Sequence, residues 1–322
     1  MEHIKNYPIN LLEVIKARKI VNSYLKPTNL INYPNLSRDI GVDIYIKHEN
    51  HNPTRSFKIR GGINLMYHLK QNNIKDVITF STGNHGLSIS TSAKMLGLNA
   101  TVVVPNGNNI TKNNMIKDTG AKLIQGGDTF EDASKVVEEI VKQNDAYYAH
   151  PADEPHLING VGSEFLEILE DLCDIDAIIL PLGGGSEVAA ATTVFKALKP
   201  EIEIYAVQAE QSCAAYKSWK EKKILSSSNT SFAGGFATGI GYETPFNIYK
   251  NALSDFVLLS EDEIYKGIKL AKEYTNNIVE GAGASTIMAA IKLKDRLKNK
   301  KVVLQYSGAN PTLEELKISE KY

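Results

Sequence analysis

The feature of the sequence that most constrains the fold is a regular alternation of short apolar runs with longer segments of helical periodicity. Nine runs have the composition of strands, and several are apolar almost throughout, as strands buried on both faces of a parallel sheet are. They are residues 43–47, 77–81, 100–104, 122–125, 146–149, 177–182, 202–207, 256–259 and 302–306. Between them lie amphipathic segments such as residues 130–142, in which Val136, Val137 and Ile140 share one helical face. This alternation predicts an α/β fold with mostly parallel sheets and helices on both faces.

The size and charge of the chain exclude several classes of protein. Its 322 residues correspond to about two domains at roughly 150 residues each. With 36 Lys and Arg against 37 Asp and Glu, the net charge is −1, so the chain lacks the basic excess of a nucleic-acid-binding protein. The longest apolar runs are far shorter than the roughly 18 residues of a membrane span. We therefore expect no nucleic-acid partner and no membrane partner.

The N-terminal residues and the cysteines indicate the compartment. Residues 1–7 contain neither the apolar segment nor the small-residue cleavage site of a signal peptide. The two cysteines, Cys173 and Cys213, cannot form a disulfide framework, and they do not have the spacing of metal ligands. We therefore expect a cytoplasmic protein.

Open parallel sheets bind ligands at the carboxyl ends of their strands, so the residues that follow each predicted strand are candidate site residues. Ser-Thr-Gly-Asn-His-Gly at residues 81–86 follows the second predicted strand and begins a helical segment. Backbone N–H groups at such a helix start can bind an anion, for example a substrate carboxylate. A capped helix explains the same residues, and for this segment taken alone it is the simpler interpretation.

Three consecutive glycines follow the sixth predicted strand and precede a helical segment. Gly183, Gly184 and Gly185 let the backbone approach a phosphate closely, and Ser186 can cap the helix or donate its hydroxyl. The dinucleotide fingerprint is absent because Val188 stands where its third glycine would be, and the Gly-Lys-Ser/Thr of a P-loop is missing as well. A phosphate site and a tight glycine turn explain this segment equally well.

A serine and a lysine follow two further predicted strands. Ser307 comes directly after the last one, where its hydroxyl can point into a crevice or start a turn. Lys58 follows the first one, close to Pro53 and Thr54, which are typical of a helix start. The positive end of a helix dipole disfavours a charged ammonium there, and the free amine is the nucleophile of Schiff-base chemistry. An exposed lysine is the alternative interpretation.

Taken together and in this order, these segments resemble the fold-type II pyridoxal-phosphate enzymes, and within them the serine/threonine dehydratase and serine racemase group. The resemblance covers nearly the whole chain. Five motifs carry it: Ser-Phe-Lys-Ile-Arg-Gly at 56–61, Ser-Thr-Gly-Asn-His-Gly at 81–86, Gly-Gly-Gly-Ser at 183–186, Glu-Gly-Ala-Gly at 280–283 and Ser-Gly-Ala-Asn at 307–310. Each motif is weak alone, but five in this order and spacing are specific.

The resemblance implies a role for each matching residue. Lys58 would hold pyridoxal 5'-phosphate as a Schiff base, Phe57 would pack beside its ring, and Asn84 would hydrogen-bond its 3-hydroxyl. The substrate carboxylate would be held by the backbone of Ser81, Thr82, Gly83, Asn84 and His85. The remaining cofactor-binding residues would be Gly183, Gly184, Gly185 and Ser186 at the phosphate, Ser307 at the pyridine nitrogen, and Gly235 and Glu280 along the site.

The same resemblance implies the reaction. A neutral hydroxyl at Ser307 would leave the pyridine nitrogen largely unprotonated, which favours β-elimination over transamination or decarboxylation. Lys58 would remove the Cα proton, and L-threonine or L-serine would give a 2-oxo acid and ammonia. The alternatives are a serine racemase, a 3-hydroxyaspartate dehydratase, a β-replacing synthase and a catalytically silent amino-acid-binding protein.

Some positions depart from the pattern of the family. Arg55 stands where relatives usually have glycine, and its side chain would face solvent, the cofactor phosphate or a second carboxylate of the substrate. Glu187 would suit the start of a helix but would repel a phosphate. Thr82 stands where racemases carry a serine that protonates the opposite face of the carbanion, which weakens the racemase interpretation. Ser81 and Thr82 are nevertheless candidate catalytic residues beside Lys58.

A divalent cation is doubtful on the same grounds. Some relatives bind one through a glutamate, a backbone carbonyl four residues later and an aspartate two residues further on. Here the three positions are Glu210, Ala214 and Tyr216, so the second carboxylate is missing. We therefore expect no metal site, with Glu210 as a doubtful ligand.

The resemblance also implies an architecture like that of the tryptophan synthase β chain, with two lobes and the cofactor between them. Residues 77–148 would form a small mobile domain that binds the substrate carboxylate. Residues 1–76 together with 149–322 would form the large domain that binds pyridoxal 5'-phosphate. The partners would be a small amino-acid substrate and a second copy of the chain in a homodimer.

Overall fold

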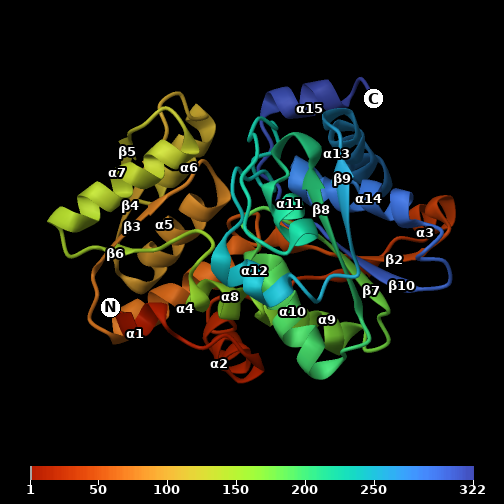
Figure 1. Ribbon diagram of the computed structural model, residues 1–322, viewed down its shortest axis with the longest axis horizontal. Coiled ribbons are helices and arrows are strands. Elements are labelled where there is room, and N and C mark those ends of the chain that lie inside the picture. Colours follow the sequence, from red (N-terminus) through yellow and green to blue (C-terminus); the bar gives the residue numbers. More distant parts are fainter. Residues whose placement is uncertain (1) are drawn as a thin grey trace. The chain divides into compact units, whose positions relative to one another are not determined.

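The structure is a computed structural model that describes residues 2–322 and consists of two compact units (Figure 1). Unit 1 contains the residues up to Lys26 together with Lys58–Ser163. Unit 2 contains Pro27–Phe57 together with Glu164–Tyr322. The chain therefore passes between the units three times, and one of these passages separates Phe57 from Lys58.

Unit 1 is built around a parallel sheet with the strand order β5-β4-β3-β6. Its strands are β3 (Asp76–Phe80), β4 (Asn99–Val104), β5 (Lys122–Gln125) and β6 (Tyr147–Tyr148). Its helices are α1 (Glu2–Lys5), α2 (Leu11–Val21), α4 (Lys58–Gln71), α5 (Asn84–Leu96), α6 (Ile110–Asp118), α7 (Phe130–Gln143) and α8 (Pro155–Val161). The apolar face of α7 packs Ala133 and Val137 against Phe80 and Val103 of the sheet, as its sequence periodicity predicts.

Unit 2 is built around a six-stranded sheet with the order β1-β2-β10-β7-β8-β9, in which only β1 is antiparallel to its neighbour. Its strands are β1 (Leu30–Asn32), β2 (Asp43–Lys47), β7 (Ala177–Pro181), β8 (Glu203–Ala209), β9 (Asp255–Leu259) and β10 (Lys301–Gln305). Its helices are α3 (Pro34–Ile40), α9 (Ser163–Asp171), α10 (Ser186–Leu198), α11 (Ala214–Glu221), α12 (Glu243–Tyr249), α13 (Glu261–Thr275), α14 (Gly281–Leu293) and α15 (Leu313–Ser319). Two short 3₁₀ turns, η1 (Glu49–His51) and η2 (Glu210–Ser212), complete it.

The order of the strands in unit 2 places a ligand site. The chain proceeds outward from β7 through β8 to β9, and then returns to place β10 on the other side of β7. All five residues of β7 are buried because helices cover both faces of the sheet. A crevice opens at the carboxyl ends of two strands where the strand order reverses in this way. For unit 2, these strands are β7 and β10.

All nine predicted runs are strands, and the fold is the α/β class that the alternation predicts. Sequence reasoning missed β1, which pairs with β2 at the edge of the sheet. This strand is only three residues long and half-buried, so it lacks the continuous apolar run of a central parallel strand.

The division into compact units differs from the predicted domains in where several segments belong. The predicted small domain, residues 77–148, lies wholly within unit 1. Unit 1 also contains three segments that the prediction gave to the large domain: residues up to 26, 58–76 and 149–163. The predicted small domain is one that moves relative to the large domain, and this mobility stays a prediction.

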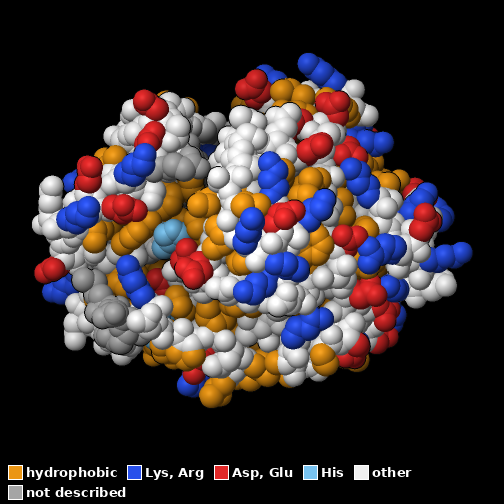
Figure 2. Space-filling view, viewed as in Figure 1, with side chains coloured by type: hydrophobic (Ala, Val, Ile, Leu, Met, Phe, Trp, Pro, Cys, Tyr) orange, Lys and Arg blue, Asp and Glu red, His pale blue; other side chains and the backbone are white. Residues whose placement is uncertain are grey.

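The distribution of surface charge, the lengths of the helices and the state of the cysteines can be compared with the expectations from composition. Lys and Arg are interspersed with Asp and Glu over the face shown in Figure 2, without a region of one sign. Within residues 2–322 no helix has both the length and the hydropathy that crossing a bilayer requires. Cys173 is exposed and Cys213 is buried, and both are free thiols.

Candidate active site

Two of the predicted motifs follow neighbouring strands of unit 2. Strands β7 and β10 are parallel, with Ile178 opposite Val303. Gly183 follows β7 and Ser307 follows β10, so both lie at the same edge of the sheet, where the strand order reverses. The structure thus places residues more than one hundred positions apart in the sequence at one edge of the sheet.

The glycine loop packs closely against a second backbone segment. A Cβ atom added to Gly183 would lie 2.9 Å from the carbonyl oxygen of Gly235, so the two backbones pass each other in contact. Gly185 has a φ of 89°, in the left-handed region that favours glycine, and it precedes the first residue of α10, Ser186. A helix N-terminus preceded by closely approaching backbone suits the phosphate group of a cofactor. The residues present therefore fit such a group.

Glu280 connects this loop to the motif after β10. A Cβ atom on Gly235 would lie 2.9 Å from Oε1 of Glu280. Glu280 donates its backbone N–H to the carbonyl of Gly308 over 3.1 Å, and its Oε2 accepts the backbone N–H of Asn310 over 3.1 Å. Glu280 and Ser307 are both buried. The predicted residues at 235, 280 and 307 are therefore fixed to one another.

The segment before Lys58 runs alongside the same motif. The backbone N–H of Phe57 donates to the carbonyl of Ser307 over 3.1 Å. The N–H of Ala309 donates to the carbonyl of Arg55 over 2.8 Å, and Nδ2 of Asn310 donates to the carbonyl of Thr54 over 3.0 Å. These bonds hold the side chain of Phe57, 7 % exposed, in unit 2, immediately before Lys58 in the chain.

Lys58 is the first residue of α4 in unit 1. The predicted helix start at Pro53 and Thr54 is wrong, because residues 54–57 form backbone hydrogen bonds and an isolated bridge with the 307–310 motif instead. The consequence drawn from it is confirmed, since Lys58 lies at a helix N-terminus. The hydroxyl of Ser88 in α5 donates to the carbonyl of Lys58 over 2.6 Å.

Close packing of α4 against α5 fixes the position of Lys58 further. A Cβ atom on Gly62 would lie 2.4 Å from Oγ of Ser88 and 2.6 Å from Oγ of Ser92, so only glycine allows this approach. Helix α5 begins three residues after Ser81 and carries the predicted carboxylate-binding residues at its N-terminus. Lys58 and these residues therefore belong to one packed unit.

The residues 81–85, named here the 81–85 turn, comprise the three residues between β3 and α5 and the first two residues of α5. The backbone N–H of Gly83 donates to Oγ of Ser81 over 3.1 Å, which closes the turn. Gly83 is the N-cap of α5 and has no side chain to satisfy the first N–H groups of the helix. No acidic residue lies in the first turn of α5. This arrangement suits a carboxylate, whose oxygens accept the N–H groups that a helix start presents.

His85, in the 81–85 turn, is a neutral imidazole. Burial lowers the pKa of His85 to about 3, and the positive charge of Lys58 contributes to this shift. Oγ1 of Thr79 donates its proton to the carbonyl of Ala149 over 2.7 Å, so it accepts from Nε2 of His85 over 2.9 Å. The Nε2–H tautomer follows from this chain of hydrogen bonds, and it adds no charge to the turn.

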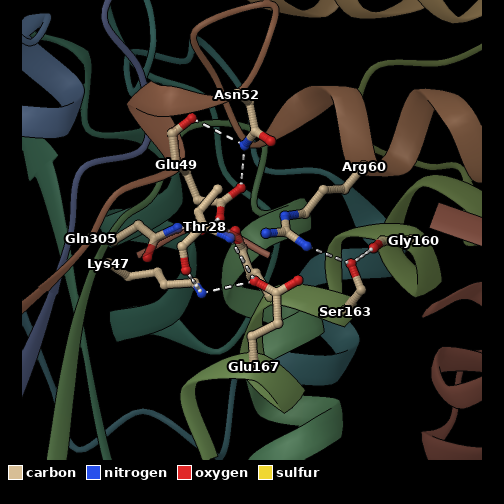
Figure 3. A network of polar contacts seen from close by, with 10 residues as sticks. Thr28, Lys47, Glu49, Asn52, Arg60, Gly160, Ser163, Glu167 and Gln305 are labelled. Carbon is tan, nitrogen blue, oxygen red and sulfur yellow. Dashed lines mark hydrogen bonds and ion pairs between the residues drawn. The ribbon is translucent and has the colours of Figure 1, made fainter. Parts of the chain in front are cut away.

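A buried polar network in unit 2 holds the segment that leads to Lys58 (Figure 3). Nζ of Lys47 donates to Oε2 of Glu167 and to the carbonyl of Thr28, each over 2.8 Å. The hydroxyl of Thr28 donates to Oε1 of Glu49 over 2.5 Å, and Nδ2 of Asn52 donates to Oε2 of Glu49 over 2.6 Å. All five residues are buried, so the network fixes the chain between β2 and residue 52.

The predicted site residues therefore form two groups. Unit 2 brings together Phe57, Gly183, Gly184, Gly185, Ser186, Gly235, Glu280 and Ser307. Unit 1 brings together Lys58, Ser81, Thr82, Gly83, Asn84 and His85. The covalent bond between residues 57 and 58 joins the two groups in sequence. The roles assigned to these residues remain predictions, and so do the homodimer and the cytoplasmic location.

The departures from the family pattern have clear places in the structure. Arg55 is exposed and has a φ of 55°, in the left-handed region that favours glycine. Glu187 is buried in the first turn of α10. Glu210 is exposed in η2, and within residues 2–322 no group of three or more His, Cys, Asp or Glu residues could hold a metal ion.

We expect Arg55→Gly to raise the free energy of unfolding by about 0.5–1 kcal/mol, because glycine removes the cost of a left-handed backbone at a residue with a Cβ. Chemical denaturation measures the effect. Arg55→Ala is the matched control, since it removes the same charge and keeps the Cβ. Equal stability of the two variants would show that the backbone conformation is not the cause.

Sequence reasoning missed Ser88 and Lys112, which also contact this site. Ser88 binds the carbonyl of Lys58, as described above. The side chain of Lys112, in α6, passes over Gly83 of the 81–85 turn. For Ser88 the sequence carries no signal. For Lys112 the signal is a lysine in the first turn of the helix after β4, the neighbour of β3.

Known proteins are similar to this chain in sequence and in fold. The family model described as pyridoxal-phosphate dependent enzyme matches residues 21–308. The chain is 32 % identical over 311 residues to the catabolic L-threonine dehydratase TdcB of Staphylococcus aureus, covering 95 % of this chain and 90 % of that protein. It is 31 % identical over 306 residues to the L-threonine ammonia-lyase of Thermotoga maritima, covering 94 % and 76 % respectively.

A solved structure shows the same relationship. The serine racemase of Dictyostelium discoideum superposes with a TM-score of 0.88 and 30 % identity, covering 95 % of this chain and 99 % of that one. The family match accounts for the order of the five motifs and for the glycine loop that fits a phosphate. The cofactor is pyridoxal 5'-phosphate. The chain belongs to the fold-type II pyridoxal-phosphate dependent enzymes, in which it is related to the threonine dehydratases and the serine racemases.

Proposed function

We propose that this enzyme converts L-threonine, L-serine or both into a 2-oxo acid and ammonia by β-elimination of the hydroxyl group. L-Threonine then gives 2-oxobutanoate, and L-serine gives pyruvate. The similarity to a threonine dehydratase and a threonine ammonia-lyase supports this reaction. The position of Ser307 is the observation that carries the proposal. This residue is buried, carries a hydroxyl group, and accepts a backbone hydrogen bond from Phe57, which immediately precedes Lys58 in the chain.

When bound, the cofactor withdraws electrons from Cα of the substrate and so makes its proton acidic. Lys58 acts as the general base that accepts this proton at Nζ, and it returns a proton to the departing β-hydroxyl. The 81–85 turn holds the substrate carboxylate through its backbone N–H groups. Ser307 provides a neutral hydroxyl where a carboxylate would keep the pyridine nitrogen protonated, and this difference favours elimination over transamination.

A panel of β-hydroxy amino acids tests the proposal. The holoenzyme is incubated with L-threonine, L-serine and 3-hydroxyaspartate, and both the 2-oxo acid and the chirality of the remaining amino acid are measured. We expect 2-oxobutanoate or pyruvate to form together with ammonia. Accumulation of D-serine without an oxo acid would replace the proposal by a racemase. A yellow holoenzyme that changes none of these compounds would indicate an amino-acid-binding protein.

A further inference from the structure

Lys112 lies across the 81–85 turn. It belongs to the first turn of α6, and its backbone N–H donates to the side chain of the N-cap residue Asn109 over 3.1 Å. A Cβ atom added to Gly83 would lie 3.4 Å from Cδ of Lys112, 3.9 Å from Cε and 3.7 Å from Nζ. The amine of Lys112 is therefore in contact range of the turn to which we assign the substrate carboxylate.

The charge of Lys112 serves no structural interaction. Within residues 2–322, no carboxylate lies within ion-pair distance of Nζ of Lys112, and the side chain is half-buried. Lys300, which is also half-buried, pairs with Glu203 over 2.7 Å. Lys112 also stands in the first turn of a helix, where the dipole disfavours a cation. A lysine at this position therefore does not stabilise the fold, and a role in binding would explain why it is there.

The surroundings of Gly83 make this charge significant. Neither α5 nor α6 has an acidic residue in its first turn. The N-terminus of α5 and the amine of Lys112 both lie beside Gly83, so two sources of positive potential meet at one turn. His85 in the same turn is neutral, so it is Lys112, and not His85, that supplies side-chain charge beside Gly83.

We propose that Lys112 binds the α-carboxylate of the substrate. Its ammonium supplies positive charge, while the backbone N–H groups of the 81–85 turn supply hydrogen bonds that orient the carboxylate. The site thereby selects amino acids with a free carboxylate over their neutral amides. A lysine suits this role because its ammonium is a compact charge on a flexible stem. The inference rests on the carboxylate site of the proposed function, and it adds the residue that recognises the charge.

The test compares the binding of L-alanine and L-alaninamide to the holoenzyme, followed by the change in visible absorption of the bound cofactor. L-Alanine has no β-leaving group, so the measurement does not depend on which reaction the enzyme catalyses. We expect Lys112→Gln to raise the Kd of L-alanine about tenfold, and the Kd of the amide less than twofold. Lys112→Arg keeps the charge and should restore most of the affinity for L-alanine.

Lys117→Gln is the matched control, because Lys117 is an exposed lysine in the last turn of the same helix. It should change neither Kd. Added salt should weaken L-alanine binding by the unmodified enzyme, and should weaken it much less in Lys112→Gln, since screening acts on a charge that this variant lacks.

Three results would overturn the inference. These are an unchanged Kd for L-alanine in Lys112→Gln, an equal weakening for the amide, and no binding of L-alanine by the unmodified holoenzyme. Failure of the proposed function has a different signature: the panel of β-hydroxy amino acids then yields no oxo acid, while L-alanine and its amide still separate Lys112→Gln from the unmodified enzyme.

Discussion

Lys58→Ala is expected to lower the turnover of L-threonine by about 10³-fold or more. In the mechanism that we propose, the variant loses the amine that joins the cofactor to the chain and the base that accepts the Cα proton, and general-base catalysis alone contributes roughly 10²–10⁴-fold. Production of 2-oxobutanoate at saturating substrate measures the effect. The hydroxyl of Ser88 binds the backbone carbonyl of residue 58, which the variant keeps, so the fold should remain intact.

Lys70→Ala serves as the control for this variant. Lys70 is an exposed lysine in the last turn of α4, the same helix that Lys58 begins, and its loss should leave turnover within a factor of two. Unchanged thermal unfolding of Lys58→Ala would show that the variant is folded. If folded Lys58→Ala retained a tenth or more of the activity, the assignment of Lys58 as the base would be wrong.

Lys47→Ala is expected to lower the free energy of unfolding by roughly 3–5 kcal/mol, the cost of leaving a buried charge without its partner. Lys47 is fully buried, and its loss removes the 2.8 Å ion pair to Glu167, whose side chain is 2 % exposed. It also removes the donor to the carbonyl of Thr28. Chemical denaturation of the variant and of the unmodified protein measures the difference.

The exposed ion pair between Lys301 and Asp174 provides the comparison on the same sheet. Lys301→Ala should cost far less than Lys47→Ala, because water screens that pair. The double variant Lys47→Met with Glu167→Leu removes both buried charges and should be much more stable than Lys47→Ala. A small loss in Lys47→Ala, similar to that of Lys301→Ala, would show that the buried network does not hold the segment leading to Lys58.

The sequence predicted the strands of the fold because buried parallel strands are apolar almost throughout, as β7 is. It also predicted that Gly183 and Ser307 follow strands, and the structure confirms these positions after β7 and β10; their role as site residues stays a prediction. It did not predict that β7 and β10 are neighbours, since strand order depends on how the whole chain packs. The edge strand β1 was missed for a local reason, because it is short and only half-buried.

Contacts between helices could not be predicted from the sequence either. Ser88 lies thirty positions after Lys58, and only the close packing of α4 and α5 around Gly62 places its hydroxyl on the carbonyl of Lys58. The helix start that Pro53 and Thr54 indicated fails because pairing with residues 307–310, a tertiary interaction, outweighs the local preference. Arg55 lies in the same paired segment, and an arginine residue does not by itself predict the left-handed backbone conformation found there.

The most direct test of the account is to identify the lysine that carries the cofactor. The holoenzyme is reduced with borohydride and digested, and the peptides are analysed by mass spectrometry. The account predicts one pyridoxyl adduct, on Lys58, together with loss of the visible absorption band. An adduct on another lysine, or a protein that binds the cofactor without any reducible bond to lysine, would contradict it.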